Sequence, residues 1–509
     1  MSSRGLQPAI VLVADRTLSA DYKVLFEGIF ATMQTTNCPG PLMRHFVSPP
    51  VRTDAAGRAR IAPLGLRRVE SALLAAGVAG PDDVVCATPE SLPRLLGPWT
   101  RIVGVSSSDF LGRGMSNTTT HSFWGGRLYS EYWLAGMMEK IRRAKARHGF
   151  SVLAGGAGAW QLAADPDRAR ELGFDCVFEG HFEQEGPPLA AGALAGKPLP
   201  AHVRASSTAC EQIRPIVGPS VMGTIELSRG CGKGCRFCTA GLHKMSHLPK
   251  DLILADLAAN VAGGRSCIVS SSEDFFRYGG TGPHVNFEAL RGLLESMRAM
   301  KGLGFMQIDH ANVSSVLQFE KEQLREINRL LQWERPSEYL WVNLGIESAN
   351  GKLVQANGPG KIMPFGAEDW ESMVKQAAAA LEESGFFPVF SVILGLPGET
   401  PEDVHRTRQL VEWLSRRRSV IFPIFHEPID AQARGRGEAF GVGRMRQDHL
   451  DLYTACYEIN FRRVPSLYWD NQRAGGVGLA KRLAVQLLGR AEVRAWRKNF
   501  ARTRKKLKA

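Results

Sequence analysis

The chain has 509 residues, of which 44% are hydrophobic and 22% are charged; this length exceeds what one hydrophobic core organises and predicts two or three domains. The composition is typical of a globular protein and excludes a disordered chain, and no apolar run approaches the roughly 18 residues that a transmembrane helix needs. The net charge of +13 is unevenly distributed along the chain. Residues 481–509 contain eleven Lys or Arg and the single acid Glu492, so this segment alone carries a charge of +10.

Nine cysteines are present, and only three of them are clustered. A disulfide framework usually shows an even number of cysteines at regular spacing. We therefore expect reduced thiols and a cytoplasmic location.

The first third of the chain alternates short apolar runs with helical patterns, notably at residues 66–76 and 129–145. This alternation predicts a parallel sheet with helices on both faces, a flavodoxin-like Rossmann domain over residues 1–183. The predicted buried strands are residues 10–14, 84–87, 102–106, 152–155 and 176–179.

Ligands of such sheets bind beyond the carboxyl ends of the strands. There the sequence has SSSDFLGRG from Ser106 and a glycine-rich loop after the fourth predicted strand. We expect Ser106, Ser107, Gly155 and Gly156 to line a ligand site, the glycines because they let a ligand approach the backbone. Tight turns alone would explain the same glycines equally well.

Residues 184–222 are rich in Pro, Gly and Ala without sustained periodicity, and we expect a linker there. A second block of alternating strand and helix patterns covers residues 223–425. Six such units predict an incomplete parallel barrel whose functional rim lies at the strand C-termini. The predicted strands are residues 223–228, 267–270, 306–308, 341–346, 389–394 and 420–425.

The loop after the first barrel strand contains Cys231, Cys235 and Cys238. Thiolates at this spacing bind zinc or an iron–sulfur cluster. Structural zinc takes four protein ligands, and His243 and His247 are the nearby candidates for a fourth. Three thiolates fit a four-iron cluster with one iron left open for chemistry.

The CxxxCxxC motif, with Phe237 before its last cysteine, on the loop after the first strand of a six-unit barrel resembles the radical S-adenosylmethionine (SAM) superfamily. The resemblance covers roughly residues 220–430. It implies a [4Fe-4S] cluster on the three cysteines, reductive cleavage of SAM to a 5'-deoxyadenosyl radical, and an electron donor such as flavodoxin or ferredoxin. Arg229 and Lys233, beside the cysteines, are either tuning charges or solvated loop cations.

Three further rim segments match the same family at lower specificity. Each acid among them, taken singly, is also explained as a helix cap or a solvated loop residue. The resemblance assigns Ser272 and Glu273 to the methionine amino group, Glu347 and Ser348 to the ribose or carboxylate, and the backbone of Ile393 and Gly395 to the adenine.

A flavodoxin-like domain ahead of such a barrel resembles the cobalamin-binding branch of the superfamily, which includes methylases of unactivated carbons. The usual Asp-x-His-x-x-Gly signature is missing, because Asp15 has no histidine two residues later. We expect cobalamin without an imidazole ligand, although a domain that had lost cobalamin would share this absence.

Transfer RNA methylthiotransferases are a rival within the superfamily, and the basic tail favours them. These enzymes hold a second cluster on three N-terminal cysteines. Here Cys38 lies in a predicted loop, but Cys86 and Cys176 fall inside predicted strands, where core packing explains them better. We therefore do not favour this rival.

Residues 426–509 depart from the barrel pattern and predict a helical cap with a basic tail. Its candidates for substrate contact or radical quenching are His426, Tyr453, Cys456 and Tyr457, although each of these is more often a core or surface residue. Val493, Trp496 and Phe500 recur at helical spacing among basic residues. This pattern predicts a peripheral helix on the inner face of the membrane. A solvated tail or a nucleic-acid contact would also explain the charge, although we expect no nucleic-acid partner.

The predicted function is a cobalamin-dependent radical SAM enzyme that methylates an unactivated carbon of a lipid or natural product. The alternative is a cobalamin-independent radical SAM enzyme that closes a ring or couples carbons on a lipid or isoprenoid. A non-enzymatic alternative, a zinc-stapled nucleic-acid adaptor, would contain zinc and no iron.

Overall fold

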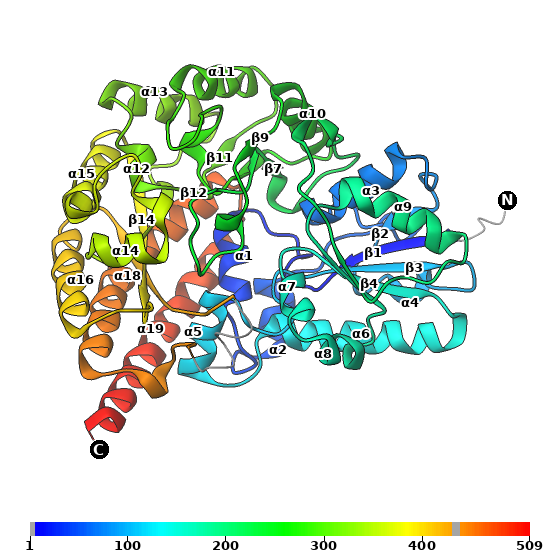
Figure 1. Ribbon diagram of the computed structural model, residues 1–509, viewed down its shortest axis with the longest axis horizontal. Coiled ribbons are helices and arrows are strands. Elements are labelled where there is room, and N and C mark those ends of the chain that lie inside the picture. The colour runs from blue at the N-terminus through cyan, green and yellow to red at the C-terminus, as the bar shows by residue number, and fades with distance from the viewer. Residues whose placement is uncertain (1–5, 430–437, 509) are drawn as a thin grey trace.

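The computed structural model describes residues 6–429 and 438–508. Two α/β lobes lie side by side, the N-terminal lobe on the right of Figure 1 and the barrel lobe on the left. Two long helices, α18 (Gln447–Ala474) and α19 (Leu479–Lys508), pack together on the barrel side of the molecule. The predicted fold class, a Rossmann-type lobe followed by a partial barrel and a helical C-terminal region, is confirmed.

The N-terminal lobe contains a parallel sheet with the strand order β2-β1-β3-β4-β5-β6. This is the flavodoxin-like order, with its switch point between β1 and β3. All five strands predicted from the sequence are present, and β6 extends the sheet. The strands are β1 (Ile10–Ala14), β2 (Val84–Cys86), β3 (Ile102–Ser106), β4 (Ser151–Gly155), β5 (Cys176–Glu179) and β6 (His202–Arg204).

Helices cover both faces of this sheet. Along β1, Val11 and Val13 belong to the core on one face, and Ile10 and Leu12 belong to the core on the other. Side chains alternate along a strand, so a strand buried on both faces needs an unbroken apolar run. The helices of this lobe are α1 (Leu25–Thr32), α2 (Gly40–Leu42), α3 (Leu64–Ala75), α4 (Leu92–Leu95), α5 (Met115–Trp124), α6 (Tyr129–His148), α7 (Ala159–Ala163), α8 (Pro166–Leu172) and α9 (Phe182–Leu194).

The barrel lobe contains two parallel sheets, ordered β11-β10-β7 and β12-β13-β14-β15. Its third unit is split into β11 and β12, so the six predicted strand units are all present. The strands are β7 (Thr224–Glu226), β10 (Cys267–Ser271), β11 (Phe305–Gln307), β12 (His310–Ala311), β13 (Leu340–Glu347), β14 (Phe386–Leu394) and β15 (Val420–Phe425). The helices between them are α10 (Lys250–Ala262), α11 (Phe287–Arg298), α12 (Val313–Val316), α13 (Lys321–Leu331), α14 (Gly351–Asn357), α15 (Trp370–Glu383) and α16 (Pro401–Leu414).

The barrel is open between its first and last strands, since within the described residues β7 and β15 are not hydrogen-bonded to each other. Residues of the N-terminal lobe contribute to the barrel core. Val24 and Phe123 are buried in the same apolar cluster as the barrel strands, and the Thr119 hydroxyl of α5 accepts a hydrogen bond from the Phe425 backbone N–H at 2.7 Å. The barrel core therefore extends into the contact between the two lobes, while the N-terminal sheet keeps its own apolar clusters.

Residues 184–222, expected to be a linker, contain most of α9 and all of β6. Although Pro187 and Pro188 lie inside α9, Ala190 of the same helix is buried against Leu66 and Leu73 of α3. Packing on the sheet layer therefore stabilises a helix that its composition disfavours. The linker expectation was wrong for this part of the chain.

The aromatic residues of the basic tail do not face outward. Trp496 and Phe500 are each only 5% exposed, because they pack into the aromatic cluster of α18 and α5. Val493 is half-buried. The prediction that the aromatic pair lies at the headgroup level of a membrane was therefore wrong. None of the helices in the described ranges is both long and apolar enough to cross a bilayer.

Candidate functional site

The cysteine motif lies on a loop held at its base by a short antiparallel pair, β8 (Ser228–Arg229) with β9 (Ser246–His247). Gly230, Gly232 and Gly234 all have positive φ near 70°. This alternation with ordinary residues is a backbone pattern found around iron–sulfur and phosphate sites. A Cβ on Gly230 would stand 2.6 Å from a backbone carbonyl, so only glycine fits there.

The three cysteines are withdrawn from solvent. Cys231 and Cys235 are buried, and Cys238 is partly buried. Burial raises the pKa of the Cys231 thiol to about 11 and also raises the pKa of the other two thiols. Thiolates at this place therefore need a bound cation to be stable.

Cationic side chains surround the cysteine loop. The Arg277 guanidinium donates to the Cys231 carbonyl at 2.8 Å. Lys233 and Lys361 also lie close enough to oppose the rise in the pKa of the Cys231 thiol. Such buried cations offset the negative charge of a thiolate-bound cluster. Lys233 is therefore not a solvated loop cation, as its side chain is only 5% exposed.

Two buried acids pair with these lysines and keep one oxygen free. Lys233 Nζ lies 3.2 Å from Asp274 Oδ2, and Lys361 Nζ lies 2.5 Å from Glu347 Oε1. The remaining oxygens, Asp274 Oδ1 and Glu347 Oε2, accept no hydrogen bond within the described residues. Buried acceptors are normally satisfied, so these two oxygens favour a polar ligand in the site.

Glu347 has the backbone geometry of a functional position. Its φ is +57° at the end of β13, where the pairing with β14 is irregular. A left-handed conformation costs a non-glycine residue about 1–3 kcal/mol and is concentrated at active sites. A side chain on Gly345 would overlap the Glu347–Lys361 pair, which explains the glycine. Contact of Glu347 with a cofactor stays a prediction.

The other predicted polar residues differ in orientation. Glu273 is exposed. Its negative charge helps to raise the pKa of the Cys238 thiol, although the burial of that thiol is the larger cause. Ser272 is buried, and its hydroxyl lies 3.4 Å from the Asp274 backbone N–H. The Ser348 hydroxyl is engaged by Thr407 of α16 at 3.2 Å. Ser348 therefore fastens the loop to a helix, and its contact with a cofactor stays a prediction.

The segment after β14 borders the cysteine loop. Ile393 is buried in a cluster with Cys235 and Phe237. Gly395 has φ +80°, and a Cβ there would overlap the ring of Phe440. Its backbone N–H donates to Glu399 at 2.9 Å. The packing of Ile393 therefore brings this segment beside the cysteines, and its contact with adenine stays a prediction.

The cap helix α18 supports this segment through a buried histidine. His449 Nε2 lies 2.9 Å from the same Glu399 carboxylate. Its Nδ1 accepts the Arg446 backbone N–H at 3.2 Å, so Nε2 carries the proton and donates. The sequence did not predict this contact, nor the roles of Lys361 and Asp274. In each case the two partners are distant in the chain.

The polar residues at the edge of the N-terminal sheet mostly bond to one another. The Ser107 hydroxyl donates to Asp15 Oδ2 at 3.0 Å, and burial raises the pKa of Asp15 to about 6. A Cβ on Gly156 would stand 2.5 Å from the Ser106 hydroxyl. A close contact within the protein therefore already explains this glycine without a ligand. A Cβ on Gly155 would meet the Phe178 carbonyl oxygen at 3.9 Å, which is an ordinary contact. Cobalamin contact at these residues stays a prediction.

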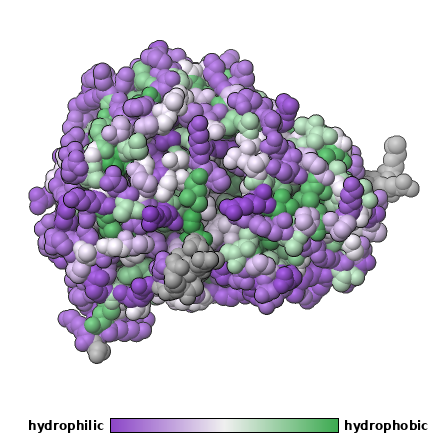
Figure 2. Space-filling model, in the orientation of Figure 1, coloured by the Kyte–Doolittle hydropathy of each residue, from purple (hydrophilic) through white to green (hydrophobic). Residues whose placement is uncertain are grey.

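This edge of the sheet faces the barrel rim. After β3, Met115 packs against the cluster formed by Cys235, Phe237, Ile393 and Leu396. After β5, Glu183 of α9 accepts a hydrogen bond from Arg229 at 2.6 Å, and Arg229 lies two residues before Cys231 in the chain. On the face shown in Figure 2 the surface is hollowed near its middle, between the lobes.

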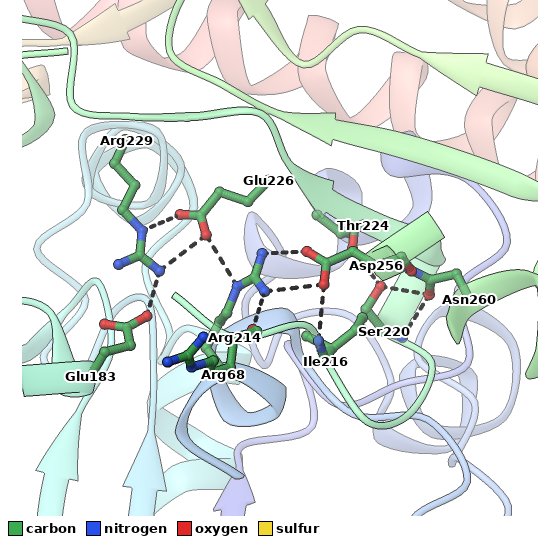
Figure 3. Close-up of polar contacts among 10 residues, drawn as sticks. All are labelled: Arg68, Glu183, Arg214, Ile216, Ser220, Thr224, Glu226, Arg229, Asp256 and Asn260. Atoms are coloured by element: carbon green, nitrogen blue, oxygen red, sulfur yellow. Dashed lines mark hydrogen bonds and ion pairs between the residues drawn. The ribbon is translucent and has the colours of Figure 1, made fainter. Parts of the chain in front are cut away.

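Arg229 belongs to a buried polar network that joins the lobes (Figure 3). It binds Glu183 at 2.6 Å and Glu226 at 2.8 Å, and Arg68 of α3 binds the other oxygen of Glu226 at 3.2 Å. Arg68 also pairs with Asp256 of α10. Arg229 is only 9% exposed, so it is not a solvated loop cation. Its effect on a cluster stays a prediction.

The zinc alternative lacks a fourth ligand. His247 has both ring nitrogens engaged, by the Ser228 hydroxyl and by the Gly280 carbonyl, each at 3.0 Å. His243 is exposed. Within residues 6–429 and 438–508, no three His, Cys, Asp or Glu side chains converge on one point to hold a single ion. A four-iron cluster does not need such convergence, since each thiolate binds a different iron.

The second-cluster rival fails on the strand order. Cys86 ends β2 and Cys176 begins β5, and both are fully buried. Three strands separate β2 from β5 in the sheet, which places these cysteines roughly 19 Å apart. They cannot share a cluster with Cys38.

Comparisons with known proteins agree with the site. Residues 225–411 match the radical SAM superfamily. The chain is 25% identical over 272 residues to the ribosomal protein uS12 methylthiotransferase RimO of Frankia casuarinae. This match covers 48% of this chain and 48% of that protein. The match therefore spans about half of that relative.

A solved structure of the radical SAM methyltransferase TsrM from Kitasatospora setae, with cobalamin and a [4Fe-4S] cluster bound, has a similar fold. The TM-score is 0.50 at 15% sequence identity, over 82% of this chain and 72% of that one. The family match, the cysteine spacing and the barrel rim together identify residues 225–411 as a radical SAM domain, whose family binds a [4Fe-4S] cluster and SAM.

Proposed function

We propose that the protein is a cobalamin-dependent radical SAM enzyme that methylates an unactivated carbon. The proposal rests on the contact between the carboxyl edge of the N-terminal sheet and the rim of the barrel. The ligand-binding edge of a flavodoxin-like sheet reaches the cysteine-bearing rim through Met115 and Glu183. A cofactor held at each edge would then face the same space. The fold likeness to TsrM supports this arrangement.

In the barrel, this chain's residues bind and enclose the cofactors. Cys231, Cys235 and Cys238 hold the [4Fe-4S] cluster, which supplies one electron for SAM cleavage when bound. The free oxygens of Asp274 and Glu347 accept N–H or O–H groups of SAM. The apolar residues around Cys235 keep water from the reacting groups.

In the N-terminal lobe, Gly155 is the last residue of β4, and its lack of a side chain offers the close approach that a corrin ring needs. Cobalamin, when bound there, supplies methyl transfer. The position of the missing histidine is Thr17, whose backbone N–H donates to Asp15 at 2.9 Å. These residues fit cobalamin held without a protein imidazole.

The alternative is a cobalamin-independent radical enzyme that closes a ring or couples carbons. The internal bonding of Asp15, Ser107 and Asp109 favours it, because a ligand finds few free polar groups at that edge. A lipid or natural-product substrate and a flavodoxin or ferredoxin electron donor are parts of either proposal.

The test is anaerobic purification with iron, cobalt and zinc quantified per chain, followed by assay for deoxyadenosine. We expect about four irons in the wild type and one cobalamin, and loss of iron and of SAM cleavage in Cys235→Ala. Cys38→Ala, at a partly buried loop cysteine of the other lobe, is the matched control and should retain both.

Each other outcome is informative. Deoxyadenosine formation without cobalt binding would select the cobalamin-independent alternative. Zinc without iron would overturn the radical SAM assignment of the site. Loss of a second complement of iron in Cys38→Ala would revive the methylthiotransferase rival.

A further inference from the structure

The helix α19 has two faces of opposite character. The inward face carries Trp496, Phe500 and Thr503, which are each 5% exposed. The outward face of the first half carries Leu479, Leu483 and Leu487, which are 56%, 51% and 65% exposed. These are large apolar side chains left in water on successive turns of one helix.

The leucines continue into a cationic row. With about 100° of rotation per residue, Arg490, Arg494 and Lys498 lie within roughly 60° of the direction of Leu483, whereas Trp496 points about 140° away. Arg490, Arg494 and Lys498 are exposed. In the described part of the chain none of these three cations forms an ion pair with an acidic side chain. One face of α19 is therefore apolar for about 12 Å and then cationic for about 12 Å.

We propose that this outward face of α19, defined by Leu479, Leu483, Leu487, Arg490, Arg494 and Lys498, docks on an anionic phospholipid surface. Leucines enter the boundary between headgroups and acyl chains, and the arginines and lysine meet lipid phosphates and carboxylates. The C-terminal end of α19 projects from the body of the molecule (Figure 1), and the exposure of the three leucines shows that solvent reaches the first half of the helix.

Charge and chemistry select this partner over two others. A nucleic acid would neutralise the cations but would leave the three leucines in water. A second copy of the chain would cover the leucines but would bring like-charged rows of Arg and Lys together. An anionic bilayer satisfies both parts of the face at once. The proposal does not depend on the reaction proposed above.

The experiment is sedimentation of the full chain with phosphatidylcholine vesicles, with and without phosphatidylserine. We expect binding only to the vesicles that contain phosphatidylserine. Leu479→Gln/Leu483→Gln/Leu487→Gln should weaken the partition by about 100-fold. Arg490→Gln/Arg494→Gln/Lys498→Gln should weaken it by about 100-fold at low salt and less at high salt.

Val217→Gln is the matched control, since Val217 is an apolar residue outside α19 that is 58% exposed. This variant should bind vesicles as the wild type does. Thermal melts of all variants establish that the fold is intact, which is expected because the changed side chains face solvent.

Three results would overturn the proposal. The first is no binding of the wild type to anionic vesicles. The second is unchanged binding by the leucine variant, which would leave only a nonspecific charge effect. The third is a concentration-dependent dimer that the leucine variant abolishes in the absence of vesicle binding, which would assign the face to self-association.

Discussion

The buried network around Arg229 predicts a large effect of a single substitution. In Arg229→Met, Glu183 and Glu226 lose their direct partner, although their side chains are only 6% and 15% exposed. Only Arg68 then faces Glu226, and Arg68 is already shared with Asp256. Removing one partner of a buried ion pair costs about 3–5 kcal/mol, because the other charge is left uncompensated.

The pH dependence follows from the carboxylates. Burial acts to raise the pKa of Glu226, but the attraction of Arg229 and then of Arg68 outweighs it and holds that pKa below its ordinary value. A lowered pKa contributes stability above the unfolded-state pKa, and this contribution is lost as the pH falls through the folded-state pKa. The cost of Arg229→Met should therefore be largest at neutral pH and shrink toward acid pH, where the stranded carboxylates take up protons.

The assay is a thermal melt at several pH values, in which a loss of 3–5 kcal/mol lowers the midpoint by roughly 3–5 °C, since a chain of 509 residues shifts by about 1 °C per kcal/mol. Arg52→Met, the same change at an exposed residue, is the control and should stay within about 0.5 kcal/mol of the wild type. Adding Glu183→Gln to Arg229→Met should recover part of the loss. A midpoint equal to that of Arg52→Met, or a further loss on adding Glu183→Gln, would refute the reasoning.

Three further predictions concern other buried groups. Asp15→Asn should gain about 2 kcal/mol relative to the wild type between pH 4 and pH 7, because a pKa raised from 3.8 to about 6 costs the wild type stability as the pH rises. A flat difference across pH would contradict this. Trp496→Ala should lose about 3–5 kcal/mol in thermal melts because its ring is core, whereas an equal melt to wild type would mean that the ring is free. Lys361→Met should lose about 3–5 kcal/mol by stranding Glu347, and adding Glu347→Gln should restore part of it; no restoration would exclude a charge effect.

The strands and the cysteine motif could be predicted from the sequence because their signals are local. An unbroken apolar run such as IVLVA predicts a strand buried on both faces, wherever the rest of the chain lies. The spacing of Cys231, Cys235 and Cys238 likewise indicates a cluster loop from eight consecutive positions. Both signals are complete within one short segment.

Long-range pairs could not be predicted in this way. Lys361 meets Glu347, and Lys233 meets Asp274, but neither pair has a fixed spacing that a pattern could detect. Such contacts depend on how the strands are ordered around the barrel. The sequence could indicate an acid at the rim, as it did for Glu347, but not the cation that balances it.

The helices α9 and α19 show most clearly what the sequence determines and what only the tertiary structure decides. Composition disfavours α9, yet Ala190 is buried against α3, and tertiary packing outweighs weak helix propensity. In α19 the periodicity correctly grouped Trp496 with Phe500 on one face. Periodicity states which side chains share a face but not what covers that face, so only the tertiary structure decided that the aromatic face is buried and the leucine face is exposed.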